Sequence, residues 1–70
     1  MLFSCSSSRK VGHNDYEVES LIEAYDAGQA AKLFFLDMLS VGWECCSVAV
    51  TAGRAVRLFH IEKNILKEER

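Results

Sequence analysis

Five side chains of the types that bind metal ions or act as nucleophiles occur in the sequence: Cys5, His13, Cys45, Cys46 and His60. Zinc sites place such ligands at short spacings such as CxxC or HxxxH, and neither spacing occurs here. Cys45 and Cys46 are adjacent, and adjacent residues of a strand point to opposite faces. The sequence therefore predicts no metal site and no cofactor.

A cysteine near a histidine could also form a nucleophilic pair, because a neighbouring imidazolium lowers the pKa of a thiol. We expect Cys45 to lie opposite His60 in a hairpin, but the sequence offers no third residue that would orient His60. A small thiol in a strand usually serves packing. GxSxG and phosphate-binding glycine loops are absent from the sequence. We therefore expect that the protein is not an enzyme, and the odd cysteine count favours a reducing, cytoplasmic environment.

The segment from Asp26 to Val41 is predicted to be a helix with apolar residues on two opposite faces. One face holds Ala27, Ala30, Ala31, Phe34, Met38 and Val41, and the other holds Leu33, Leu36 and Leu39. A surface helix needs a single apolar face. Something must cover the leucines, either the C-terminal residues Ile61, Ile65 and Leu66 or a second copy of the chain.

The segment from Tyr16 to Tyr25 fits two structures. A helix would align Val18, Leu21, Ile22 and Tyr25, whereas a strand would separate Tyr16, Val18, Ile22 and Ala24 from Glu17, Glu19 and Glu23. Asp26 and Gln29 form a capping box for the following helix, and Gly28 would weaken a continuous helix. These signals favour a strand at this segment.

The C-terminal half alternates in the manner of a β-hairpin. Trp43 to Thr51 and Arg54 to Ile61 are predicted strands, joined at Ala52 and Gly53. With this loop Ala49 would lie opposite Val56, Ser47 opposite Leu58, Val50 opposite Ala55, Val48 opposite Arg57 and Cys46 opposite Phe59. The segment from Glu62 to Arg70 is expected to be a short helix or a fraying tail.

Residues 1–14 are rich in serine and poor in apolar side chains, so we expect a flexible N-terminal arm followed by a single small domain at 15–70. The predicted fold is α+β, with one helix packed on a three-stranded sheet in the order β-α-β-β. The alternative α-α-β-β applies if Tyr16 to Tyr25 is helical. The expected buried core is Phe34, Met38, Val41, Val48, Val50, Val56 and Leu58.

The element order from about Tyr16 to Ile61 resembles the layout of several small phage-encoded inhibitors, including some anti-CRISPR proteins. The resemblance implies a protein that inhibits by occupying the surface of a partner.

The segment from Val11 to Ala31 contains five acidic residues and no lysine or arginine. The acidic residues are Asp15, Glu17, Glu19, Glu23 and Asp26. They fit a solvated face that limits strand aggregation, and they also fit a surface that docks a basic protein. The net charge of −2 argues against nucleic acid and anionic membrane, and no apolar run reaches the roughly 20 residues that span a bilayer.

The sequence therefore favours a non-catalytic interaction or inhibitor domain, expected to be a homodimer. The expected partner-binding residues are Glu17, Glu19, Glu23, Leu33, Leu36 and Leu39. The alternative is a small nucleic-acid-binding or regulatory domain that uses Arg9, Lys10, Arg54 and Arg57.

Overall fold

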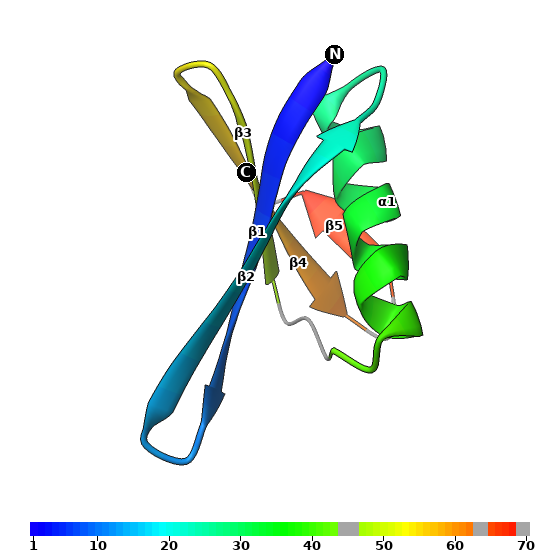
Figure 1. Ribbon diagram of the computed structural model, residues 1–70. Helices are drawn as coiled ribbons and strands as arrows, with labels where there is room; N and C mark the ends of the chain where they lie inside the picture. Colours follow the sequence, from blue (N-terminus) through cyan, green and yellow to red (C-terminus); the bar gives the residue numbers. More distant parts are fainter. Residues whose placement is uncertain (44–46, 63–64, 69–70) are drawn as a thin grey trace.

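A computed structural model describes residues 1–43, 47–62 and 65–68, and these form one helix on a five-stranded antiparallel sheet (Figure 1). Along the chain the elements are β1 (Leu2–Val11), β2 (Asn14–Glu23), α1 (Ala27–Ser40), β3 (Ser47–Ala52), β4 (Ala55–Glu62) and β5 (Ile65–Glu68). The strands are arranged in the order β2-β1-β3-β4-β5. β1 is therefore an inner strand, and β2 and β5 are the edges of the sheet.

The expectation of a three-stranded sheet in the order β-α-β-β is wrong, and so is the alternative α-α-β-β. The sheet has five strands because the two ends of the chain also form strands: β1 pairs with β2 and β3, and β5 pairs with β4. The strand preferred for Tyr16 to Tyr25 is present as β2. The order strand, helix, strand, strand on which the resemblance to small phage-encoded inhibitors rested is present as β2, α1, β3 and β4, but element order alone says little about function, so that resemblance supports no conclusion.

The structure places most of residues 1–14, where a flexible arm was expected, in β1. A two-residue turn at Gly12 and His13 joins β1 to β2, with Gly12 at a φ of 63°. Phe3, Cys5 and Ser7 are buried on the face of β1 toward α1. The backbone of β1 pairs with β2 along its full length and with β3 at Ser4, Cys5 and Ser6, and this pairing stabilises the serine-rich strand although few of its side chains bury apolar surface.

α1 begins and ends at local signals that the sequence contains. Asp26 is the N-cap, and its side chain accepts a hydrogen bond of 2.7 Å from the backbone N–H of Gln29. After the C-terminus, the N–H of Gly42 donates to the carbonyl of Leu39 and the N–H of Trp43 donates to that of Met38. Gly42 has a φ of 81°, so this end is a Schellman motif in which glycine relieves the strain.

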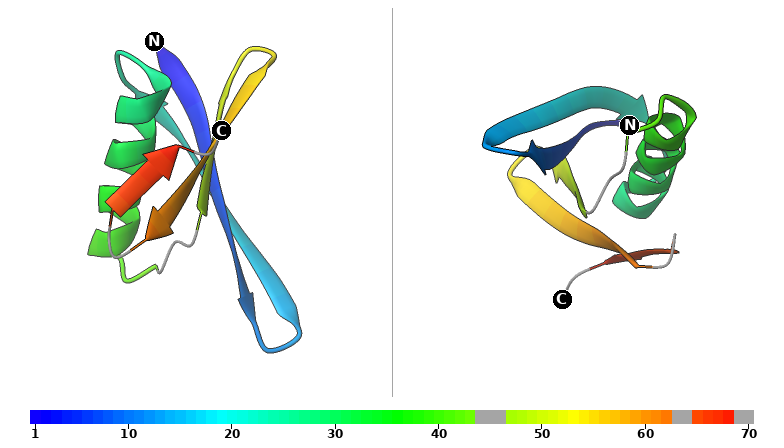
Figure 2. Two further views of the ribbon diagram at one scale, coloured as in Figure 1. Left: turned by 180° about the vertical axis from the view of Figure 1, so that it is seen from behind. Right: turned by 90° about the horizontal axis from the view of Figure 1, so that it is seen from below.

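The core lies between α1 and one face of the sheet (Figure 2). Small side chains at Ala30 and Ala31 let α1 approach β1, where the Cys5 thiol donates to the Ala30 carbonyl at 3.7 Å. The buried apolar residues are Phe3, Cys5, Ile22, Ala24, Ala27, Ala30, Ala31, Phe34, Phe35, Val48, Val50 and Phe59.

Three members of the expected core are in place: Phe34, Val48 and Val50 are buried, and Met38 packs against them while partly exposed. The other three are exposed. Val41 follows the last turn of α1, and Val56 and Leu58 point to the face of the sheet that α1 does not cover. The strand alternation was predicted correctly, but the expectation that Val56 and Leu58 would be buried was wrong.

The β3–β4 hairpin is present with a register two residues from the expected one. Gly53 and Arg54 form the turn, with Gly53 at a φ of 61°, so Ala52 pairs with Ala55 and Ser47 with His60. The shift is even, so each side chain keeps its predicted face. The expected pairs of Cys45 and Cys46 lie outside the described residues. β5 takes the place of the expected terminal helix or tail.

Replacing Phe34 with alanine should lower the free energy of unfolding by about 3–5 kcal/mol, because Phe34 is fully buried between α1 and the sheet. Tyr25→Ala is the matched control, since the Tyr25 side chain is 91% exposed, and it should change stability by less than about 0.5 kcal/mol. Urea denaturation followed by circular dichroism measures both. Equal losses in the two variants would show that the core is misplaced.

Candidate functional site

β2 offers an unpaired strand edge. Its ten residues all pair with β1 on one side, and no described strand pairs on the other side. The N–H and C=O groups of every second residue of β2 therefore point outward, away from β1. The β1–β2 hairpin also projects beyond the end of α1, so the tip of this edge is open to approach (Figure 1).

The acidic side chains of β2 alternate with those that face the helix. Glu17, Glu19 and Glu23 are exposed on the face away from α1, whereas Ile22 is buried and Val18 packs against the core. Alternate residues of a strand lie about 7 Å apart, so the carboxylates form a row. The Ser4 hydroxyl donates to Glu19 Oε1 at 3.1 Å, and the Met1 amino group donates to Glu23 Oε1 at 2.6 Å. These contacts hold the carboxylates of Glu19 and Glu23 next to β1.

The three leucines of the outer helix face are uncovered. Leu33, Leu36 and Leu39 are 41%, 50% and 46% exposed. β5 lies beside α1 and contacts it (Figure 1), and Leu66 and Ile61 pack against the core while Ile65 is exposed. The C-terminal residues considered from the sequence therefore leave the three leucines about half exposed.

The structure does not bring the expected acidic and leucine residues into one site. The glutamates lie on the open face of the sheet, and the leucines lie on the outer side of the helix that covers the opposite face. Glu23 and Leu33 alone among them share a surface, a shallow hollow of about 370 Å³ between β2 and α1. The protein thus presents two separate candidate surfaces.

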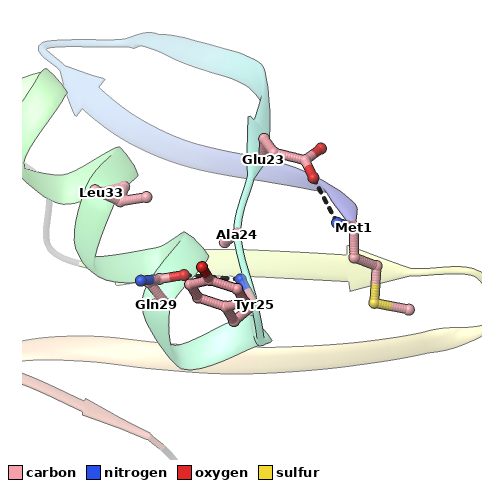
Figure 3. Close-up of a pocket in the computed structure, with 6 residues that line it drawn as sticks. All are labelled: Met1, Glu23, Ala24, Tyr25, Gln29 and Leu33. Atoms are coloured by element: carbon pink, nitrogen blue, oxygen red, sulfur yellow. Dashed lines mark hydrogen bonds and ion pairs between the residues drawn. The ribbon is translucent and has the colours of Figure 1, made fainter.

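Figure 3 shows the hollow between β2 and α1, which Met1, Glu23, Ala24, Tyr25, Gln29 and Leu33 line. Its polar groups bond to one another: Gln29 Oε1 accepts from the backbone N–H of Tyr25 at 2.7 Å, and Glu23 pairs with the Met1 amino group. The Tyr25–Gln29 hydrogen bond lies in the turn between β2 and α1, and the Met1–Glu23 pair joins the start of β1 to the end of β2.

The basic residues of the nucleic-acid alternative do not form one patch. Arg57 binds Glu68, with Nη2 donating to Oε1 at 2.6 Å, and the guanidinium of Arg9 lies 5.6 Å from the centre of the Trp43 ring. Arg54 lies in the β3–β4 turn, at the opposite end of the sheet from the β1–β2 turn that Lys10 adjoins (Figure 1). The positive charges are dispersed and partly neutralised.

The residues with chemical potential are also dispersed. Cys5 is in the core, His13 is in the exposed β1–β2 turn and His60 is on β4, while Cys45 and Cys46 lie outside the described residues. Among the residues that the structure describes, no group of three or more histidine, cysteine, aspartate or glutamate side chains could hold a metal ion. Burial raises the pKa of the Cys5 thiol to about 11, which disfavours the reactive thiolate.

Two features of the surface were not anticipated from the sequence. One is the backbone edge of β2, which only the position of β1 inside the sheet reveals. The other is a set of exposed apolar residues on the open face of the sheet: Leu2, Leu21, Val56 and Leu58. Leu21, Ser4, Thr51 and Val56 form one row across four strands. The sequence signal for Leu21 was the alternation in β2, where it occupies a position between Glu19 and Glu23.

No protein-family model, curated protein or solved structure matches this chain. No helix in the described part of the chain is long and apolar enough to cross a membrane.

Cys5 should resist alkylation while the protein is folded. Because the pKa of Cys5 is raised on folding, the contribution of its protonated thiol to stability is fully present below the pKa of an unfolded cysteine, about 8.5. That contribution declines as the pH rises from there toward 11. A Cys45→Ala/Cys46→Ala variant leaves Cys5 as the single thiol. Mass spectrometry should find it unmodified by iodoacetamide until urea unfolds the chain. Labelling of the folded variant at the rate of a free peptide thiol would contradict the burial of Cys5.

Proposed function

We propose that this protein is a non-catalytic interaction domain whose edge strand β2 binds an extended, basic segment of another protein. The observation that supports this function is the unpaired ten-residue edge of β2, which carries Glu17, Glu19 and Glu23 on one face. Strand addition of this kind gains affinity from main-chain hydrogen bonds and specificity from alternating side chains.

The spacing of the carboxylates defines the chemistry of the partner. A lysine or arginine at every second position of an added strand would lie opposite or diagonal to Glu17 and Glu19, where each opposite-charge pair contributes roughly 0.2–1 kcal/mol. Leu21 lies between Glu19 and Glu23 on the same face of β2, and its apolar side chain favours an apolar partner residue at that point. The preferred partner therefore alternates basic residues and contains one apolar residue in the same face.

The same charges disfavour pairing of β2 with β2 of a second copy. An antiparallel pair of this strand would bring glutamates close to glutamates, and like charges opposite one another destabilise a strand pair. The acidic residues thus reject self-association at this edge while they favour a basic strand. The sequence left two explanations of the acidic residues open, protection of a strand edge and docking of a basic partner. Under this proposal both apply, because the same charges do both.

A domain that binds in this way acts by occupying a surface of its partner, as an inhibitor or an adaptor does. The buried free thiol of Cys5 suits a reducing compartment, which supports a cytoplasmic location. The dispersed positions of Arg9, Arg54 and Arg57 give no comparable support to nucleic-acid binding.

A fluorescein-labelled ten-residue peptide that alternates lysine and threonine should bind the protein, and the matched glutamate–threonine peptide should not. Binding measured by fluorescence anisotropy should weaken as salt is raised. The outward-facing amides of β2 should become protected from hydrogen exchange in the complex. Lysine-peptide binding that leaves β2 amides unprotected would contradict strand addition, and absence of binding at low salt would contradict the acidic docking surface.

Glu17→Lys should weaken binding of the lysine peptide about fivefold, because it replaces an attractive cross-strand pair with a repulsive one. Glu62→Lys makes the same change of charge at an exposed residue of β4 and is the matched control, which should retain most of the affinity. Equal loss in both variants would indicate a response to net charge rather than to the β2 edge.

A further inference from the structure

The outer face of α1 combines a pair of leucines with opposite charges on its two flanks. At 100° per residue, Leu36 lies directly opposite the buried side of α1 and Leu33 lies next to it. Lys32 flanks this pair on one side and Asp37 flanks it on the other. All four residues are exposed.

Lys32 and Asp37 cannot pair with each other on one helix, because ion pairs along a helix join residues three or four positions apart. The residues at those positions from Lys32 are Gly28, Gln29, Phe35 and Leu36, and those from Asp37 are Leu33, Phe34, Ser40 and Val41. Neither charge takes part in an ion pair among the described residues. Ser40 bonds to the backbone carbonyl of Asp37, so the carboxylate is left to solvent.

This pattern matches one seam of a parallel two-stranded coiled coil. With Leu33 at position a and Leu36 at position d of a heptad, Lys32 falls at g and Asp37 at e. In a parallel pair the g residue of one helix meets the e residue five positions later on the other helix. Lys32 would therefore reach Asp37 of the partner subunit, and the twofold axis repeats this ion pair.

We propose that a second copy of this chain covers the leucines, with the two α1 helices packed in parallel about a twofold axis. The charges select this orientation, because an antiparallel pair would place the Lys32 flanks on one side of the interface and the Asp37 flanks on the other. The sheets lie on the outer sides of the two helices, since α1 stands between its own sheet and the interface (Figure 2).

The seam is short. A helix of 14 residues is about 21 Å long, and the neighbouring core positions are the polar residues Gln29 and Ser40. The contact is therefore smaller than the roughly 800 Å² per partner of a standard stable interface, and the dimer should dissociate in the micromolar range. The part of each β2 edge near the hairpin tip projects beyond α1 and away from the seam (Figure 1), so the dimer would present two strand-binding edges at once.

Sedimentation equilibrium of wild type, Leu36→Glu and Leu58→Glu tests the location of the interface. Leu58 is the matched control because it is 49% exposed, against 50% for Leu36, and lies on the open face of the sheet. Wild type and Leu58→Glu should dimerise, and Leu36→Glu should remain a folded monomer by circular dichroism. A wild type that stays monomeric at several hundred micromolar would overturn the proposal, as would dissociation by Leu58→Glu but not by Leu36→Glu.

Charge variants test the orientation without changing a leucine. Lys32→Asp and Asp37→Lys should each weaken self-association about tenfold, because each replaces two attractive pairs with two repulsive ones, and an equimolar mixture should recover it. The double variant Lys32→Asp/Asp37→Lys should dimerise as wild type does and should avoid mixed dimers with it. A preference for mixed dimers of wild type and double variant would overturn the parallel arrangement, since an antiparallel pair favours them.

Discussion

The pairing of β1 with β3 is the interaction on which the rest of the structure depends. The chain forms two local units, the β1–β2 hairpin and the β3–β4–β5 meander, which three residue pairs join: Ser4 with Thr51, Cys5 with Val50 and Ser6 with Ala49. Cys5 and Val50 are both buried beneath α1, so the same contact builds the sheet and seats the helix. If this junction failed, neither unit would retain a complete core, because β-hairpins alone are marginally stable in water.

The junction also determines which surfaces are left open. Placing β1 inside the sheet sends β2 to the edge, and placing alanines of α1 over β1 turns the leucines of the helix outward. The two surfaces differ in chemistry: the β2 edge is acidic, whereas the outer face of α1 carries exposed leucines with Lys32 on one flank and Asp37 on the other. One fold thus separates the proposed binding of a foreign strand from the proposed self-association.

The sequence predicted the elements that carry a strong local signal. Asp26 and Gly42 bounded α1, the two apolar faces of that helix anticipated the exposed leucines, and β2 was correctly preferred as a strand. β1 was missed because four of its ten residues are serines, which leave its alternation without a clear hydrophobic period. Its backbone pairs with β2 along its whole length and, at Ser4, Cys5 and Ser6, with β3, which is more than 40 residues away and which no local pattern reports. The hairpin register was missed because a two-residue turn fits equally at Ala52–Gly53 and at Gly53–Arg54.

Amide hydrogen exchange across β1 and β2, measured by nuclear magnetic resonance, tests the central claim that β1 is an inner strand and β2 a free edge. This strand arrangement predicts slow exchange for consecutive amides near Ser4, Cys5 and Ser6, where β1 has partners on both sides. Along β2 it predicts alternation, with slow exchange at amides that face β1 and fast exchange at those that face outward. Fast exchange throughout residues 2–11, as in a mobile arm, would contradict it, and so would uniform protection along β2 in the monomer.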